Sequence, residues 1–484
     1  MAVELGPGRP GTLTPEQEEK LRQLWAAVFR VCGTDLTAED DEGADMEPTD
    51  SAGKASGKDG KKPDKKKKRS LFHRSKKDGN TADDSSSAAS KSTHTVNVNT
   101  DDDKYGQGKI YQDALASMTP DLIRATIWSM VKHDHPDALL LRFLRARKWD
   151  VDKALVMLVS TMHWRSQDMK VEDLVRSGEG AAVAREGGSD NQAKLSHDFL
   201  DQIRMGKSFL HGFDKTGRPI CVVRVRLHHQ GDQSEESMEQ YTVYIIETAR
   251  MLLQPPVDTA TIIFDMTSFS LANMDYTPVK FMIKCFEANY PECLGAVLVH
   301  KAPWIFQGIW KIIRGWLDPV VASKVHFTNN VKDMEQFIEK DQILKELDGG
   351  DDWEYKFVEP TPGDDDRISD TATRDQLLAK REQLYRQYEV ATGEWIMNPE
   401  GEKAKALKAE RDDIANRMRV DYWKVDPYLR ARSLYDRIGL LLPNGDVNRS
   451  LHLGIDETTQ TPGAIANPAT NGEVTASISI DDVE

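Results

Sequence analysis

Two short segments, TATIIFDM (259–266) and GAVLVH (295–300), decide the fold class of this chain. Both are runs of mostly apolar residues, which are typical of strands buried on both faces of a parallel sheet. ICVVRVRL (220–227) and VHF (325–327) predict two further strands. The intervening segments have apolar residues at helical spacing and predict helices over 238–253, 276–289, 304–317 and 331–347. Strands that alternate with helices predict an α/β domain with a mostly parallel sheet flanked by helices.

Helical patterns dominate the chain before this domain. A helix is predicted within residues 1–35, where glutamates follow a threonine cap and apolar residues recur at helical spacing. DLIRATIWSMVKHDH (121–135) and LLLRFLRARKWDVDKALVMLVSTMHWR (139–165) predict a helical subdomain over 106–170. A Gly- and Ser-rich patch at 178–190 predicts a surface loop between the subdomain and the sheet.

Two segments contain too few aliphatic residues to form a core. We predict that residues 36–105 form a disordered insertion and residues 448–484 a disordered tail. The insertion carries seven acids and no base in 36–50, then twelve Lys/Arg against two Asp in 54–77. Between the sheet domain and the tail, two apolar stripes within 364–447 predict a helical C-terminal extension of two helices, packed on each other or on the main domain.

The basic run KKPDKKKKRSLFHRSKK (61–77) leaves three interpretations open. Lys and Arg near an anionic membrane contribute ~1 kcal/mol each to association, so the run fits a membrane-binding segment. It also fits a solvated linker, or an address read by the nuclear import machinery or a nucleic acid. The acidic run before it weakens each of these options if it folds back.

Composition and motifs argue against several functional classes. The formal net charge of −15 argues against general nucleic-acid binding. No run of 18 apolar residues predicts a membrane span, and the four cysteines form no C-x-x-C pair, so we expect a cytoplasmic protein with reduced thiols and no metal site. The nucleophile elbow, P-loop and zinc-protease motifs are missing from the sequence, so we do not expect an enzyme.

Five blocks of the sequence resemble the CRAL-TRIO family of lipid-binding proteins. LLLRFLRARKWDVDKA (139–154) resembles the helical opening of that family. FDKTGRPI, ATIIFDM, NYPECLGAVLVHKAPWIF and LDPVVASKVHF resemble its lipid-binding domain in order and spacing, and place this domain at 190–360. The charged insertion and the C-terminal extension resemble the fungal phosphatidylinositol-transfer branch. The resemblance implies that the sheet and helices enclose an apolar cavity for one lipid, closed by a mobile helix.

The resemblance also implies a lipid headgroup site. Family members that bind phosphatidylinositol use an Arg-Lys pair, a Glu after Tyr-Pro and a Lys after the Asp-Pro turn, and these positions hold Arg147, Lys148, Glu292 and Lys324. Cations suit the phosphate, and a carboxylate with a lysine suits the inositol hydroxyls. Taken singly, each of these residues also fits an ordinary solvated surface. Cys293 replaces an arginine of the family pattern, which removes a cation beside Glu292.

A second departure concerns phosphatidylcholine. Family members that bind this lipid carry Ser and Thr where the present sequence has Ala260 and Ile262. The donors for a phosphatidylcholine headgroup are therefore lost. A second ligand, if there is one, is expected to be more apolar.

The segment 304–317 is the predicted gate. Its apolar residues form two stripes, interrupted only by a narrow polar line. The gate residues are Trp304, Ile305, Phe306, Ile309, Trp310, Ile313, Trp316 and Leu317. A helix this apolar is either buried in the core or alternates between the cavity and a membrane surface.

The function expected from these features is phosphatidylinositol binding, with transfer between membranes or presentation to a lipid kinase. We expect a monomer that associates peripherally with membranes and needs no cofactor besides its lipid. Two alternatives stay open at this point. One is a carrier of a sterol-like or isoprenoid molecule, and the other is a signalling scaffold that binds small GTPases.

Overall fold

Five strands form a single sheet in the computed structural model, which describes residues 6–34 and 103–449. The strands run in the order β1 (Ser208–Phe213), β2 (Pro219–Arg224), β3 (Ala260–Asp265), β4 (Leu294–His300) and β5 (Val325–Thr328). β1 pairs with β2 antiparallel, and the other three pairings are parallel. The four predicted strands are confirmed, although the second half of 220–227 turns into a 3-10 helix (Val225–Leu227). The sequence pattern did not predict β1, because His211 and Gly212 interrupt its run of apolar residues.

The two faces of the sheet contact different parts of the chain, because successive strand residues point to opposite sides. Alternate residues such as Cys221, Ile262 and Val297 line an internal cavity. Their neighbours Val222 and Ile263 pack against the segment that follows β5. Every central strand is therefore covered on both faces, as the apolar runs predicted.

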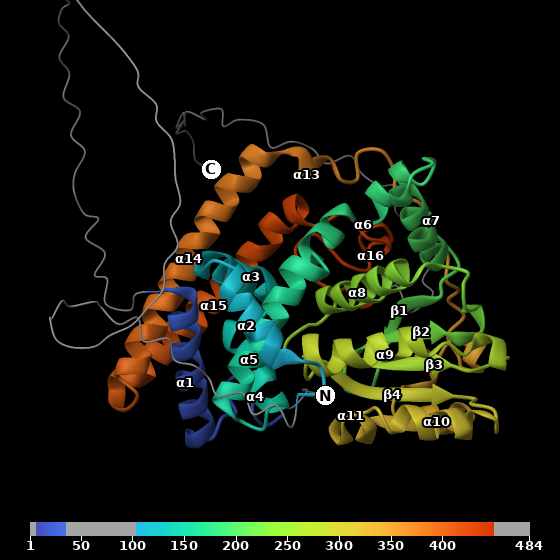
Figure 1. Cartoon of the computed structure of the whole chain (residues 1–484), viewed down its shortest axis with the longest axis horizontal. Helices are drawn as coiled ribbons and strands as arrows, with labels where there is room; N and C mark the ends of the chain where they lie inside the picture. Colours follow the sequence, from blue (N-terminus) through green and yellow to red (C-terminus); the bar gives the residue numbers. More distant parts are fainter. Residues whose placement is uncertain (1–5, 35–102, 450–484) are drawn as a thin grey trace, which may run out of the picture.

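Helices cover the cavity face of the sheet. They are α8 (Glu235–Met251), α9 (Tyr276–Lys284), α10 (Phe306–Arg314) and α11 (Pro319–Ser323). Figure 1 shows α8 toward the upper side of the sheet and α9 at the level of β2 and β3, with α10 and α11 along the lower margin beyond β4. α9 continues into a π-helix (Cys285–Asn289), a form that is frequent at functional sites.

The segment after β5 corrects one prediction. The helix expected over 331–347 is limited to α12 (Val331–Met334), and two 3-10 turns follow (Lys340–Gln342 and Lys345–Leu347). The chain folds back on itself there, because the Asp351 amide donates to the Ile343 carbonyl at 2.9 Å. Apolar side chains of this segment still pack on the sheet. Their spacing in the sequence therefore reflects burial against the sheet and not a helix.

A helical half of the molecule joins the beginning and the end of the chain. Its N-terminal members are α1 (Pro15–Cys32), α2 (Gln107–Ser117), α3 (Pro120–Val131), α4 (Pro136–Ala146) and α5 (Val151–His163), which ends in a π-helix (Trp164–Asp168). The C-terminal extension supplies α13 (Asp366–Ser369), α14 (Thr371–Met397), α15 (Gly401–Leu429) and α16 (Leu434–Arg437). The buried Asp137 carboxylate accepts from Trp25, Tyr388 and Arg411, at 2.5 to 2.9 Å. One side chain thus ties α4 to α1, α14 and α15.

The predicted loop at 178–190 is wrong for its first half. α6 (Val171–Arg185) runs through it, and α7 (Asn191–Arg204) follows. Gly178 kinks α6 with a φ of 51°, and a Cβ there would lie 2.5 Å from the Cβ of Ala431. The glycine therefore marks a close approach between α6 and the C-terminal extension, not an exposed turn.

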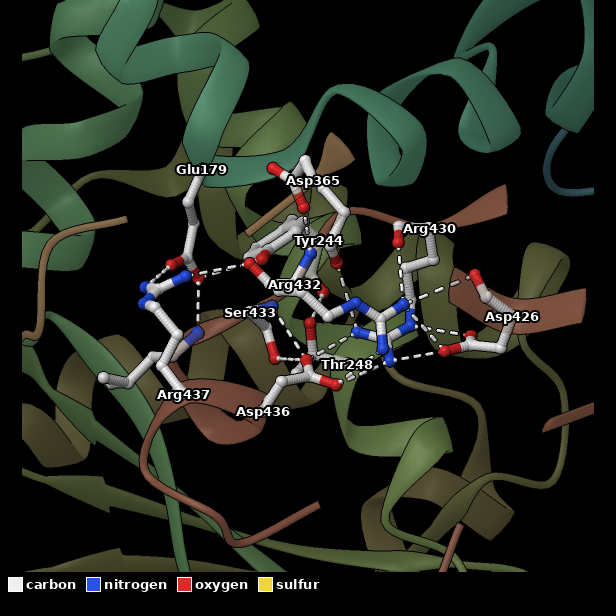
Figure 2. Close-up of polar contacts among 12 residues, drawn as sticks. Glu179, Tyr244, Thr248, Asp365, Asp426, Arg430, Arg432, Ser433, Asp436 and Arg437 are labelled. Carbon is white, nitrogen blue, oxygen red and sulfur yellow. Dashed lines mark hydrogen bonds and ion pairs between the residues drawn. The ribbon is translucent and has the colours of Figure 1, made fainter. Parts of the chain in front are cut away.

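A buried ion network connects the extension to α6 and α8 (Figure 2). Arg430 donates to both Asp426 and Asp436, at 2.8 to 2.9 Å. Glu179 of α6 pairs with Arg437 and accepts from the Tyr244 hydroxyl at 2.9 Å. Each buried charge in this network is compensated, which is the condition for a stable buried ion pair.

The predicted insertion and tail lie almost entirely outside the described residues, and so does the basic run 61–77. Three residues assigned to the insertion, 103–105, are described, and Lys104 and Tyr105 contact the helix that precedes β4. At the other boundary, Arg449 lies over the ring of Phe213 at the end of β1.

Candidate functional site

An apolar cavity of about 280 Å³ lies between the sheet and the helices α8, α9 and α10. Its wall is made mostly of aliphatic and aromatic side chains from these elements. Such a space is close in size to the smaller ligand pockets of proteins, and its apolar wall suits a hydrophobic ligand.

No helix in the described ranges is long and apolar enough to cross a bilayer.

A polar pair stands beside the cavity at the edge where the parallel strands begin. Glu292 precedes β4 and Lys324 precedes β5, and their charged atoms are 3.9 Å apart. Both side chains are about three-quarters buried, at 25% and 22% exposure, so each remains within reach of a ligand at the surface. Glu292 has a φ of 55°, an uncommon backbone conformation for a residue with a side chain.

A neighbouring arginine holds this turn in place. The buried Arg142 of α4 donates to the carbonyl of Glu292 at 2.7 Å and to that of Asp258 at 2.6 Å. Arg145, one turn further along α4, reaches the Asp258 carboxylate at 3.5 Å. The sequence reading missed both arginines as parts of the site, although their i, i+3 spacing within LRFLRARK places them on one helix face.

The other two predicted headgroup residues lie at the end of α4. Arg147 caps this helix and donates to the Gln107 side chain at 2.6 Å, which ties it to α2. Lys148 is exposed and has a φ of 51°. The structure thus brings Glu292 and Lys324 together, and it places Arg147 against α2 with Lys148 open to solvent.

The residues that depart from the family pattern line the cavity. Cys293 is one of them, and burial raises the pKa of its thiol to about 11, so it is uncharged at neutral pH. Ala260 and Ile262 also contribute to the wall. The wall next to the Glu292–Lys324 pair is therefore apolar where the family pattern would place hydroxyl donors.

The predicted gate helix α10 covers one side of the cavity. The first apolar stripe faces inward, because Phe306, Trp310, Ile313 and Leu317 all line the cavity. The second stripe consists of Ile305, Ile309, Ile312 and Trp316 and is only partly buried. The helix α10 is therefore amphipathic rather than apolar on nearly all sides as expected. Ile312 is 48% exposed, and Trp304, which precedes the helix, is 85% exposed.

A carboxylate ties the end of this gate to the rest of the molecule. Glu287, in the π-helix after α9, accepts from the Asp318 amide at 2.6 Å, just beyond α10. The same carboxylate accepts from Lys104 at 2.6 Å and from the Tyr105 hydroxyl at 2.7 Å. Lys104 also donates to the Trp316 carbonyl. The segment before α2 therefore fastens the C-terminal end of α10.

Comparisons with known proteins agree with this architecture. The family model described as "CRAL/TRIO, N-terminal domain" matches residues 112–160, and the "CRAL/TRIO domain" model matches residues 203–349. "CRAL-TRIO domain-containing protein C3H8.02" of Schizosaccharomyces pombe is 41% identical over 92% of this chain and 98% of its own length. "Phosphatidylinositol transfer protein CSR1" of Eremothecium gossypii is 40% identical over 91% of this chain and 100% of its own length.

Among solved structures, "Crystal structure of Sfh5" matches 48% of this chain and 83% of that chain. The TM-score is 0.35 and the identity is 14%, so the two structures are only weakly similar. The two fungal relatives, by contrast, match along nearly their whole length. The chain therefore belongs to the CRAL-TRIO domain family.

Proposed function

We propose that this protein binds one phosphatidylinositol molecule and transfers it between membranes. The observation that carries the proposal is an apolar cavity flanked by the Glu292–Lys324 pair at one edge. The E. gossypii relative is named as a phosphatidylinositol transfer protein, which supports the same ligand. Presentation of the lipid to a phosphatidylinositol kinase is a further use of the same complex.

The physical basis of transfer is a balance between two apolar environments. Each buried CH₂ of an acyl chain contributes ~0.8 kcal/mol, so a two-chain lipid leaves a bilayer only for an equally apolar site. The cavity wall provides that environment. Selectivity must then come from the headgroup, for which Glu292 and Lys324 offer an acceptor and a donor to inositol hydroxyls. Arg147 and Lys148 supply positive charge at the end of α4 for the phosphate.

In this proposal α10 is the gate through which the lipid enters and leaves. Its inward stripe completes the cavity wall, so displacement of α10 opens the cavity. Its outward residues, with Trp304 and Ile312 exposed beside Lys311 and Arg314, suit contact with an anionic membrane surface. Opening is therefore expected to be rare in water and frequent on membranes. The protein would act as a cytoplasmic monomer that associates peripherally with membranes and needs no cofactor besides its lipid.

A carrier of a sterol-like or isoprenoid molecule is the second candidate function. The observation in its favour is the apolar wall at Ala260 and Ile262, which gives no hydroxyl donor to a second phospholipid headgroup. This ligand would occupy the same cavity, so it would compete with phosphatidylinositol.

The test is the double variant Glu292→Ala with Lys324→Ala. Transfer of labelled phosphatidylinositol between vesicles is expected to fall at least tenfold, because both headgroup contacts are removed. The control variant is Lys301→Ala with Asp348→Ala. These two residues form an ion pair after β4, and both have a positive φ, as Glu292 does. This control should transfer the lipid like the wild type. Wild-type transfer by the Glu292/Lys324 variant would refute the headgroup assignment.

A further inference from the structure

The cavity has a second polar group, at the opposite edge of the sheet from Glu292 and Lys324. Lys207 precedes β1, and its carbonyl accepts from the Arg224 amide at 2.8 Å, which places it beside the carboxyl end of β2. His228 follows the same strand, and both residues line the cavity. β2 and β3 are each six residues long, so the two edges are separated by about 17 Å.

Lys207 is a buried cation whose two hydrogen-bond partners carry no negative charge, although the Asp232 carboxylate acts to raise its pKa. It is 6% exposed, and its ammonium donates to the Gln233 side chain at 2.6 Å and lies 3.4 Å from Nδ1 of His228. Within residues 6–34 and 103–449, no ion pair involves Lys207. An ammonium has three donors, so these two contacts leave one N–H without a partner. Burial lowers the pKa of Lys207 to about 8, which keeps most of the lysine charged at pH 7.

His228 adds a second unused donor next to the first. When Nδ1 accepts from Lys207, the proton of the neutral imidazole lies on Nε2. Nε2 is buried without a hydrogen-bond partner in the described part of the chain. Asp275 lies 3.5 Å from it, and its other oxygen caps α9 by accepting from the Thr277 amide at 2.9 Å. Burial and the charge of Lys207 lower the pKa of His228 and outweigh the opposing effect of Asp275, which favours the neutral ring.

A structural role for Lys207 alone does not explain this arrangement. The contact with Gln233 needs only a neutral donor, whereas a buried ammonium that forms no ion pair with a carboxylate is costly. The positive charge is instead explained by an anion that enters the cavity and accepts from both donors. The rest of the wall is mostly apolar, although it includes Arg250 and Asp275, so the remainder of that ligand is hydrophobic.

We propose that Lys207 and His228 bind the anionic head of an amphiphile whose acyl chain occupies the cavity. The head is a carboxylate or a phosphate monoester, and it lies at the edge of the sheet opposite the Glu292–Lys324 pair. This inference goes beyond the proposed phosphatidylinositol transfer and does not depend on it. Since one cavity serves both ligands, the amphiphile and phosphatidylinositol exclude each other.

The experiment is equilibrium binding of radiolabelled probes to the full-length protein. Oleate tests a carboxylate head, oleoyl lysophosphatidic acid tests a phosphate monoester, and oleyl alcohol is the neutral control. Lys207→Met keeps the apolar stem and removes the charge. We expect the Kd of at least one anionic probe to rise at least tenfold in this variant, while that of oleyl alcohol stays within twofold. The probe that loses more affinity identifies the head.

Two further variants separate this site from the proposed phosphatidylinositol site. His228→Phe keeps an aromatic ring and should weaken the same anionic probe, which provides a test should Lys207→Met fold poorly. Lys324→Met should leave anionic-probe binding unchanged, whereas Lys207→Met should retain phosphatidylinositol transfer. Wild-type affinity for both anions in Lys207→Met and His228→Phe would overturn the proposal. Equal affinity of the wild type for oleyl alcohol and both anions would also overturn it.

Discussion

Lys207 destabilises the ligand-free protein, because folding moves its ammonium out of water. Burial lowers the pKa of this lysine to about 8 from the usual 10.5, and Asp232 opposes the shift only in part. The unfolded chain therefore binds more protons than the folded one between about pH 8 and 10.5, so stability rises with pH in this window. A shift of this size corresponds to roughly 3 kcal/mol of destabilisation at neutral pH.

The pH dependence of Lys207→Met checks this directly. At pH 7 the variant should be more stable than the wild type, because it buries a methyl thioether instead of a charge. The difference should shrink as the pH rises from 8 to 10, since the wild-type lysine loses its proton. Urea unfolding of both proteins at pH 7, 8, 9 and 10 measures the difference. A difference that stays constant across this range would contradict the assigned cause.

Arg430 joins the end of α15 to α16, and Arg437 of α16 in turn pairs with Glu179 of α6. Arg430 is 6% exposed, and its guanidinium pairs with both Asp426 and Asp436 (Figure 2). Removal of one member of a buried ion network leaves uncompensated charge, which costs about 3–5 kcal/mol. We expect Arg430→Met to lower the free energy of unfolding by that amount.

The matched control for Arg430 is Arg417→Met, on the same helix. Arg417 pairs with Asp413, but the two side chains are 50% and 70% exposed. Exposed pairs contribute about 0–1 kcal/mol, so this variant should unfold close to the wild type. Chemical denaturation of both variants gives the comparison. Equal losses in the free energy of unfolding at the two positions would show that the buried network contributes no more to stability than an exposed ion pair does.

Among the helices, α10 is held against the cavity in two ways, by its inner face and by contacts just beyond its C-terminal end. Its inner stripe packs on the cavity wall, and Glu287 fastens the residues that follow it through Lys104, Tyr105 and the Asp318 amide. Hydrogen bonds to a charged group each contribute about 1.5–3 kcal/mol. In the proposed gating motion, these contacts have to break before α10 leaves the cavity.

Glu287→Gln tests this fastening. The neutral amide loses the charge that pairs with Lys104, so α10 should open more often and release lipid about tenfold faster. The release rate of a fluorescent phosphatidylinositol to acceptor vesicles measures the effect. Asp113→Asn is the control, because it neutralises an exposed pair with Lys109 on α2. A release rate unchanged by Glu287→Gln would mean that the lipid leaves by a route other than α10.

At the scale of the whole molecule, local patterns predicted the centre of the fold better than its margins. β3 and β4 were predictable because they are apolar on both faces, which requires a covered parallel sheet. β1 was not, because it is an edge strand completed by distant contacts, among them the Tyr435 hydroxyl that accepts from the Leu210 amide at 2.7 Å. The segment 331–347 has apolar spacing that a helix and a packed loop can both produce.

The site was predictable only where sequence position determines spatial position. Glu292 and Lys324 each precede a parallel strand, so adjacent strands bring them to the same edge, 3.9 Å apart. Lys207 gave no such signal, because its burial depends on Gln233 and His228, which pack against it from other segments. Arg142 was visible in the helical motif, yet its contacts with two backbone carbonyls follow only from the folded chain.

The proposed function requires that the cavity holds phosphatidylinositol through the Glu292–Lys324 pair. The most direct measurement is mass spectrometry of lipid extracted from the full-length protein after incubation with vesicles that contain phosphatidylinositol, phosphatidylcholine and ergosterol. We predict about one phosphatidylinositol per wild-type protein, and far less in the Glu292→Ala, Lys324→Ala variant. Wild-type protein that returns without phosphatidylinositol, or a variant that carries as much as the wild type, would contradict the account.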